Sequence, residues 1–366
     1  MRLMFVTSGL SRGGAEMFLS RLAPRLSSRG HECLVVSLGR DASLSGALAS
    51  AGVPVVHAGR ILGTLRRFRP QVIQGWMYRG NVAALLAAPF APGKPAVVWS
   101  IRQGLNDRSQ GPPATELAIW TSAKLARRPV AIVYNAESAK RQHEAAGFAA
   151  VEACVIPNGI EVPQPAGSEA ARKAARAGLG LAASAFVVAM PARWHPVKNH
   201  RGFVRAAGIF ARRRPEARFL MAGDGVDAGN ATLTQWLRDE GISGRTALLG
   251  PRTDVDAVLT AADVATLASH GEALPNALLE AMALGTPCVA PDVGDIGALV
   301  GDTGIVVAAG DAQALADGWE RLAAMSAAER HALGESARQR ARDRYGLDRA
   351  VSAFEALYLR AVNTRL

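Results

Sequence analysis

The sequence lacks any long hydrophobic run. No apolar stretch in its 366 residues reaches the roughly 18 residues that a membrane-spanning helix needs. The N-terminal segment MRLMFVTSGL also has too short an apolar core to be a signal peptide. We therefore expect a cytoplasmic protein, and we leave open a peripheral position on the cytoplasmic membrane face.

Cysteine is also scarce. Cys33, Cys154 and Cys288 are odd in number, lie far apart and show no metal-ligand spacing. Such a pattern indicates neither a disulfide framework nor a zinc site. We expect these side chains to behave as small buried hydrophobic groups, and we expect neither a cofactor nor an essential metal.

Negative charge is in deficit, because 42 Lys and Arg residues outnumber 31 Asp and Glu residues and give a net charge of +11. An excess of this kind favours an anionic partner such as a nucleotide, an acidic bilayer surface or a nucleic acid. The chain lacks both the interleaved basic and aromatic pattern and the recognition-helix motif of nucleic-acid readers. No nucleic acid is therefore expected, and much of the charge is typical of solvated helix faces.

Short apolar runs alternate with helical patterns along the whole chain. Such alternation predicts parallel sheets covered by helices on both faces, and the length predicts two domains. The absence of a clean two-residue period in the runs agrees with burial on both faces. The expected strands are 2–8, 33–38, 53–58, 71–76, 96–101, 131–135, 154–158, 185–190, 218–225, 246–250, 263–269 and 287–292.

The alternation breaks in the segment PNGIEVPQPAGSEAARKAARAGLG, where three prolines within nine residues resist both helix and sheet. We expect an N-terminal domain over residues 1–165 and a C-terminal domain over 166–345. A final helix within 346–366 is expected to pack back on the first domain. Ligands of doubly wound sheets bind beyond the carboxyl ends of the strands, so two such sheets facing a cleft predict a site there.

The stretch SHGEALPNALLEAMALGTP carries the strongest chemical signal. Pro275 and Gly285 frame a predicted helix whose only charged residue is Glu280. Asn276 lies four residues before Glu280 on the same polar stripe. Glu272 lies in the loop that enters this helix, beside backbone N–H groups suited to an anion. A structural salt bridge or a helix cap remains an equal alternative for Glu280.

The stretch MPARWHPVKNH follows an expected strand. Arg193 and Lys198, five residues apart across a proline turn, carry charges that suit a pyrophosphate without a metal. Ordinary surface charges remain the alternative. His195 and His200 receive no role.

Three further turns fit a nucleotide site. The pair Gly13 and Gly14 follows the first strand and permits close backbone approach to a phosphate or sugar, although it matches neither GxGxxG nor a Walker motif. LMAGDG and LLGPRTDV, the second of which contains Arg252, end strands in tight turns where a base and ribose would rest. Each of these is also explained as plain turn chemistry.

Taken in order, these motifs resemble glycosyltransferase family 4, a family of retaining enzymes with the GT-B fold that includes polysaccharide and lipopolysaccharide glycosyltransferases. The similarity runs through GGAE, IPNGI, PARWHPVKN, GDG, LLGPRTDV and PNALLEAMALGTPCVA, and so spans nearly the whole chain. It implies a UDP- or GDP-sugar donor on the C-terminal domain, a glycan or lipid-linked glycan acceptor on the N-terminal domain, and catalysis without an essential metal.

The resemblance also implies roles for individual residues. Arg193 and Lys198 would stabilise the leaving pyrophosphate, Glu272 would contact the donor sugar, and Glu280 would accept hydrogen bonds from the ribose. A leaving-group phosphate oxygen would serve as the base, so no protein nucleophile is required. The implied donor-binding set is Gly13, Gly14, Arg252, Ala273, Leu274, Pro275, Asn276 and Glu280, with the backbone amides of residues 273–276 holding sugar or phosphate.

The chain departs from the family pattern at two places. Gln103 follows Arg102 where related enzymes often carry a histidine, so these two residues are candidates for the acceptor side without a proton relay. Ala273 and Leu274 replace the usual glycine and aromatic residue. A nucleotide-sugar epimerase or hydrolase and a non-catalytic nucleotide-sugar-binding protein therefore remain alternatives to a transferase.

Overall fold

The computed structural model describes residues 1–11, 13–41, 43–105, 113–163 and 169–364. The chain forms two compact units. Unit 1 comprises Met1–Gly159 and the segment from Leu347 onward, and unit 2 is Ile160–Gly346. The domain boundary expected at 165–166 lies outside the described residues, and the later division falls between Gly346 and Leu347.

Unit 1 is built on a seven-stranded parallel sheet in the order β3-β2-β1-β4-β5-β6-β7. The strands are β1 (Arg2–Thr7), β2 (Glu32–Ser37), β3 (Val55–His57), β4 (Val72–Trp76), β5 (Ala96–Ile101), β6 (Ala131–Tyr134) and β7 (Ala153–Val155). The α-helices are α1 (Gly14–Ser28), α2 (Ser45–Ser50), α3 (Ile61–Phe68), α4 (Met77–Ala87), α5 (Pro113–Leu125), α6 (Glu137–Ala145) and α15 (Leu347–Asn363).

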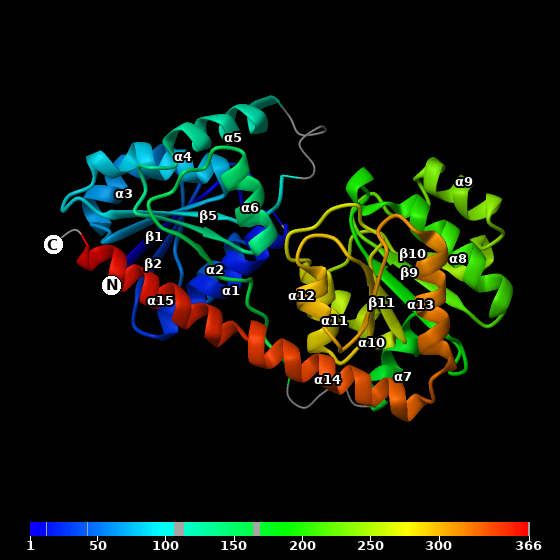
Figure 1. Cartoon of the computed structure of the whole chain (residues 1–366). Helices are drawn as coiled ribbons and strands as arrows, with labels where there is room; N and C mark the ends of the chain where they lie inside the picture. The colour runs from blue at the N-terminus through cyan, green and yellow to red at the C-terminus, as the bar shows by residue number, and fades with distance from the viewer. Residues whose placement is uncertain (12, 42, 106–112, 164–168, 365–366) are drawn as a thin grey trace. The chain divides into compact units, whose positions relative to one another are not determined.

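Alternate residues of each strand in unit 1 belong to opposite cores, as the two-residue period of a strand requires. Leu3 and Phe5 of β1 pack in the core that contains residues of α1 and α15, whereas Met4 and Val6 pack in the core that contains residues of α4 and α5. Figure 1 shows α1 and α15 on one side of this sheet and α3, α4 and α5 on the other.

The C-terminal helix α15 packs on unit 1. Phe354, Leu357 and Tyr358 are buried on one face of the helix, and the Tyr358 hydroxyl donates a hydrogen bond to Gln74 Oε1 of β4. At its start, Asp348 accepts hydrogen bonds from Arg25 of α1. An apolar stripe and a charged end thus both attach the helix to α1 and the sheet.

Unit 2 is built on a six-stranded parallel sheet in the order β10-β9-β8-β11-β12-β13. The strands are β8 (Val187–Pro191), β9 (Arg218–Ala222), β10 (Thr246–Leu248), β11 (Val264–Thr266), β12 (Cys288–Pro291) and β13 (Ile305–Val307). The α-helices are α7 (Glu169–Gly178), α8 (His200–Arg213), α9 (Ala231–Asp239), α10 (Val255–Ala261), α11 (Asn276–Ala283), α12 (Ile296–Val300), α13 (Ala312–Ala324) and α14 (Ala327–Tyr345).

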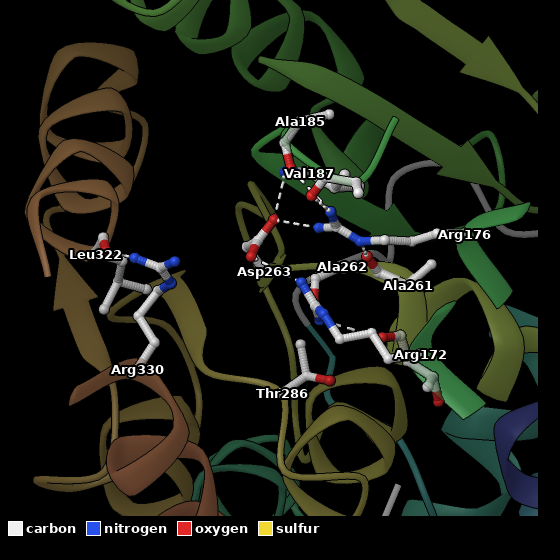
Figure 2. A network of polar contacts seen from close by, with 12 residues as sticks. Arg172, Arg176, Ala185, Val187, Ala261, Ala262, Asp263, Thr286, Leu322 and Arg330 are labelled. Atoms are coloured by element: carbon white, nitrogen blue, oxygen red, sulfur yellow. Dashed lines mark hydrogen bonds and ion pairs between the residues drawn. The ribbon is translucent and has the colours of Figure 1, made fainter. Parts of the chain in front are cut away.

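An arginine pair fastens the first helix of unit 2 to its sheet (Figure 2). Arg172 and Arg176 of α7 each donate to one oxygen of Asp263, at 2.7 and 2.6 Å. The same carboxylate accepts from the backbone N–H of Val187 at the start of β8. Burial of two cations is compensated because one carboxylate and several carbonyl oxygens accept from them. This cluster therefore has a structural role, which is to attach α7 to the sheet.

The two doubly wound parallel sheets confirm the fold predicted from the sequence. All twelve predicted strands are present, and a thirteenth strand, β13, was missed. The three cysteines are free, with Cys33 and Cys288 buried and Cys154 half-buried. Within the described ranges, no helix is both long and apolar enough to cross a membrane.

Candidate functional site

The strand order of unit 2 reverses at β8. The chain passes from β8 outward to β9 and β10 and then returns to place β11 on the other side of β8. The loops that follow β8 and β11 therefore leave the sheet in neighbouring positions at its carboxyl edge. Such a reversal point is where ligands of open α/β sheets bind.

Asn199 joins these two loops. It ends the short turn Pro196–Lys198 with a positive φ of 51° and caps α8, where its Oδ1 accepts from Gly202 N at 3.0 Å. Its Nδ2 donates to the carbonyl oxygen of Ala268 in the loop after β11. A second link runs from the backbone N–H of His270 to the Val197 carbonyl. Two hydrogen bonds thus hold the loop after β8 against the loop after β11.

Lys198 and Glu272 meet directly across this junction. The Lys198 Nζ donates to Glu272 Oε1 at 2.5 Å, and the Ser269 hydroxyl donates to the same oxygen at 2.7 Å. Their side chains are 20% and 9% exposed. Among the described residues nothing donates to Glu272 Oε2. The carboxylate is therefore oriented by two donors while one oxygen can accept from a ligand.

The segment between Glu272 and α11 differs in detail from the prediction. α11 begins at Asn276 and Pro275 occupies the cap position. Because proline has no N–H, Pro275 cannot be one of the predicted backbone donors. Ala273 and Leu274 are buried, each 7% exposed.

Gly294, in the loop after β12, fixes the path of this segment. Its φ is +61°, and a Cβ placed on it would lie 2.0 Å from the Glu272 carbonyl oxygen. The neighbouring Asp295 N–H donates to the Ala273 carbonyl at 3.0 Å. A third loop of the carboxyl edge therefore supports the segment that carries Glu272.

Glu280 and Asn276 occupy the accessible edge of α11. Both are half-buried, whereas Leu278, Leu279 and Met282 are 1% exposed or less. The predicted apolar helix with one polar stripe is confirmed. Its stripe lies at the helix surface and not in the core, so a ligand group can reach Glu280.

Arg193 projects from the β8 loop as an exposed side chain. Its backbone is held by its neighbours, because Ala192 N donates to Ala222 O and Trp194 N donates to Asp224 O. Gly223 packs so closely here that an added Cβ would lie 2.3 Å from the Ala192 carbonyl oxygen. The GDG turn thus positions Arg193 and leaves its guanidinium accessible.

His200 is buried against the same loop. It is 3% exposed, and its Nε2 donates to the Ala192 carbonyl at 3.2 Å. Its ring also packs against Trp194 at an interplanar angle of 45°, with centroids 5.0 Å apart. Burial lowers the pKa of His200 to about 4, so the ring is neutral near pH 7. The sequence analysis gave this residue no role.

Arg252 lies away from the Lys198–Glu272 pair, in the loop after the edge strand β10. It is paired with Asp254 through two hydrogen bonds of 2.8 and 2.5 Å. That pairing raises the pKa of Arg252 and lowers the pKa of Asp254. Two strands, β9 and β8, separate this loop from β11.

Unit 1 has its own reversal point between β1 and β4. Gly13 is the N-cap of α1, in the loop that follows β1, and Gly14 is the first helical residue. A Cβ on Gly13 would lie 2.5 Å from Glu16 Oε2, the end of a flexible side chain that can move aside, so space alone does not require glycine there. Gln103 is exposed in the loop after β5, and Gln142 holds this loop by accepting from Leu105 N.

Arg102, next to Gln103, is not available to an acceptor. It is 6% exposed, and its guanidinium lies 5.1 Å from the ring centroids of Phe18, Trp76 and Phe354. It donates to Ser100 Oγ and to the Ile156 carbonyl oxygen. The predicted acceptor-side position of Arg102 is corrected to a structural one, because aromatic groups from three elements enclose the cation.

The sequence analysis missed three residues that build the site in unit 2, namely Asn199, Ser269 and Gly294. The first two stand inside the quoted motifs, one next to Lys198 and the other three residues before Glu272. Gly294 gave no local signal, because its role depends on a contact between distant loops. Among the described residues no group of three His, Cys, Asp or Glu side chains is placed to hold a metal ion.

The sequence matches two models of known protein families. Residues 12–163 match the family model described as Glycosyltransferase Family 4, and residues 185–325 match the model described as Glycosyl transferases group 1. The chain belongs to glycosyltransferase family 4. The first match covers most of unit 1 and extends four residues into unit 2, and the second lies within unit 2.

Curated relatives of this family-4 chain are similar over part of their length. An Escherichia coli UDP-Gal:alpha-D-GlcNAc-diphosphoundecaprenol alpha-1,3-galactosyltransferase is 33% identical over 148 residues, which are 40% of this chain and 38% of the relative. A Mycobacterium bovis D-inositol 3-phosphate glycosyltransferase is 32% identical over 52% of this chain and 40% of its own length. The matched segments thus span well under half of these relatives.

Solved structures resemble the family-4 chain over its whole length. The Anabaena protein HepE, solved in complex with UDP and glucose, gives a TM-score of 0.85 at 21% identity and covers 98% of this chain and 99% of its own. The glycosyltransferase WaaG, involved in lipopolysaccharide biosynthesis, gives 0.73 at 14% identity and covers 96% and 99%. At these identities the similarity shows the GT-B fold.

Proposed function

We propose that the protein transfers a sugar from a UDP- or GDP-sugar to a glycan or lipid-linked glycan acceptor in cell-surface polysaccharide synthesis. One observation carries the proposal. Lys198 and Glu272, a cation and a carboxylate from two different loops, meet at the point where the strand order of unit 2 reverses. A nucleotide sugar needs both, because its diphosphate is anionic and its sugar offers hydroxyl donors.

The cationic part of the proposed site is formed by Arg193 and Lys198 beside the N-terminus of α11. In this proposal both side chains contact the diphosphate and stabilise the charge that develops on it as the sugar leaves, which is electrostatic catalysis. The backbone N–H groups that open α11 add a partial positive charge. These groups supply positive charge from the protein, and the proposal includes no essential metal.

The carboxylates take the hydroxyl groups of the donor. Glu272 Oε2 accepts from the sugar, since its other oxygen is held by Lys198 and Ser269. Glu280, on the accessible edge of α11, accepts from the ribose. Transfer proceeds with retention of the anomeric configuration, and a phosphate oxygen of the leaving group takes the acceptor proton.

The acceptor binds to unit 1 in this proposal, near Gln103. Gln103 is exposed and can hydrogen-bond a sugar hydroxyl but cannot carry a proton near neutral pH. The net charge of +11 supports a peripheral position at an anionic cytoplasmic membrane face, where a lipid-linked acceptor would lie.

A thermal-shift screen against UDP-, GDP- and ADP-sugars tests donor binding. A donor at 100 times its dissociation constant stabilises the folded state by about 2.7 kcal/mol. We expect UDP- or GDP-sugars to raise the melting temperature and ADP-sugars not to. The E. coli relative named above uses UDP-Gal and HepE was solved with UDP, so UDP-sugars are screened first.

Activity measurements test the residue assignment. Arg193→Ala is expected to lower kcat at least roughly tenfold, because it removes a contact that grows in the transition state. Glu280→Gln is expected to lower kcat/KM at least roughly tenfold, because it weakens binding of the donor ribose. Arg205→Ala and Glu216→Gln change exposed residues of the same types in unit 2 and serve as matched controls. Nucleotide release that needs no acceptor would favour an epimerase or hydrolase. Donor binding without turnover across many acceptors would favour a non-catalytic binding protein.

A further inference from the structure

A second basic region lies in unit 1, apart from the residues proposed for catalysis. Between Asp41 and Asp107 the sequence contains no acidic residue and seven basic ones. Four of these, Arg60, Arg66, Arg67 and Arg69, fall within ten residues around α3. This segment therefore contributes most of the net positive charge of the chain.

The fold gathers part of this charge around one groove. A cavity of about 1150 Å³ lies between α3 and the strands β1, β2 and β3. Arg60, Arg67 and Arg69 line it from the α3 side, and Arg2 lines it from the start of β1. The one carboxylate in the lining is Glu32. Four cations against one anion leave the groove strongly positive.

Three of the four arginines of the groove have no side-chain partner within the described part of the protein. The guanidinium groups of Arg60, Arg67 and Arg69 make no hydrogen bond or ion pair with any described residue. Arg2 donates from Nε to the Arg69 carbonyl oxygen, which brings the end of α3 against the start of β1. The helix dipole accounts for cations in the last turn of α3 but not for Arg60, which precedes the helix, or for Arg2.

Apolar side chains line the groove as well. Leu34, Val56 and Phe68 contribute to the lining, together with Thr64 and with Gly59 and Gly63, which place no side chain into the space. Guanidinium groups beside apolar side chains suit a phosphate ester whose carrier has an apolar part. A guanidinium group can donate two parallel hydrogen bonds to a phosphate. A bound phosphate would also reduce the repulsion between the neighbouring arginines.

We propose that the groove between α3 and β1–β3 binds a phosphate ester through Arg2, Arg60, Arg67 and Arg69. The phosphate belongs either to a membrane lipid headgroup or to a soluble phosphorylated compound. This site is independent of the proposed transfer reaction, because none of its residues lies in the loops that carry Gly13, Gln103, Lys198 or Glu272.

The lipid source is tested by co-sedimentation with phosphatidylcholine vesicles that contain or lack phosphatidylglycerol, at about 0.15 M salt. The groove variant Arg60→Glu/Arg67→Glu is compared with the control variant Arg141→Glu/Arg349→Glu. The control changes two exposed arginines of α6 and α15 and alters the net charge equally. We expect about a tenfold or greater loss of binding in the groove variant and little change in the control.

The soluble source is tested by calorimetric titration with inorganic pyrophosphate and glycerol 3-phosphate. The protein carries Arg193→Ala and Lys198→Ala, so that the proposed donor site no longer takes up phosphate. We expect the remaining binding to disappear when the groove variant is added to this background. If the groove variant loses binding only to the vesicles, the phosphate belongs to a lipid headgroup. If it loses binding to both the vesicles and the soluble phosphates, the groove recognises the phosphate group whatever its carrier.

Three results would overturn the proposal. Wild-type protein that binds neither ligand has no such site, and equal losses in the groove and control variants show an effect of net charge alone. Unchanged binding in the groove variant would also contradict it. All four substituted side chains are exposed, so unchanged melting temperatures are expected and exclude unfolding as the cause. Because no step requires transfer activity, failure of the proposed function leaves this test intact.

Discussion

The Nζ of Lys198 and the Oε1 of Glu272 lie 2.5 Å apart, although the two residues are separated by 74 positions in the chain. Their loops follow β8 and β11, neighbouring strands at the reversal of the strand order. Asn199 holds the two loops together and Ser269 shares the carboxylate oxygen. The pair is therefore built from several contacts and does not depend on the attraction of two flexible side chains.

Gly294→Ala should disturb Glu272 without changing any charge. A methyl group there would lie 2.0 Å from the Glu272 carbonyl oxygen, so the segment 272–275 must move. We expect a loss of stability above the roughly 1 kcal/mol that a positive φ costs, and weaker donor binding.

Gly241→Ala is the matched control for Gly294→Ala, because Gly241 has a φ of +70° but no atom within 4 Å of the added Cβ. Denaturant unfolding and donor titration of both variants make the comparison. Equal losses of stability with unchanged donor binding in both would contradict the role of Gly294.

His200 should make the protein acid-sensitive. Its folded-state pKa of about 4 lies below the ordinary value of 6.5, mainly because burial disfavours the charged ring. The unfolded chain therefore binds a proton that the folded chain does not between these two values. Stability is fully present above about pH 6.5 and is lost as the pH falls toward 4, by an amount on the order of 3 kcal/mol.

His200→Gln removes this titration while keeping an N–H that can donate to the Ala192 carbonyl. Unfolding free energies of both proteins between pH 7 and pH 4 measure the difference. The account predicts that the wild type loses more stability than the variant over this interval. Parallel curves would show that His200 is not the responsible group.

The strands of both sheets could be predicted because parallel strands buried on both faces must be apolar, and each apolar run is bounded by turns. The motif around Glu272 and the motif around Lys198 could likewise be predicted separately. Their direct contact could not, because it depends on how two loops leave the folded sheet. Ser269 and Gly294 were missed for the same reason.

Arg102 shows the opposite error. An arginine at the carboxyl end of a strand is typical of an accessible binding residue, and the sequence offered no sign of its burial. Phe18, Trp76 and Phe354, which surround it, come from three distant parts of the chain. Burial lowers the pKa of Arg102 to about 9, which leaves it charged at neutral pH.

Arg102→Met and Gln103→Ala should therefore separate stability from acceptor binding. Arg102→Met removes hydrogen bonds to Ser100 and Ile156 and the cation–π contacts, but also the cost of burying the charge, so we expect a loss of about 1 to 2 kcal/mol in unfolding free energy. Gln103→Ala should leave stability unchanged, because Gln103 is exposed, and should raise the KM for the acceptor.

Denaturant unfolding curves and the KM for the acceptor, measured for both variants, test these two expectations. An Arg102→Met protein of wild-type stability with a raised acceptor KM would restore the original prediction for Arg102. A Gln103→Ala protein with wild-type acceptor kinetics would remove Gln103 from the acceptor side.

The most direct test of the proposed donor site is a double-mutant cycle on Lys198 and Glu272, measured as the rate of sugar transfer, with Lys173→Ala as a control for loss of an exposed lysine in unit 2. We predict that Lys198→Ala and Glu272→Gln each lower kcat about 100-fold or more, and that the double variant is little worse than either. Losses below tenfold in both single variants would contradict the assignment of this pair to the reacting donor.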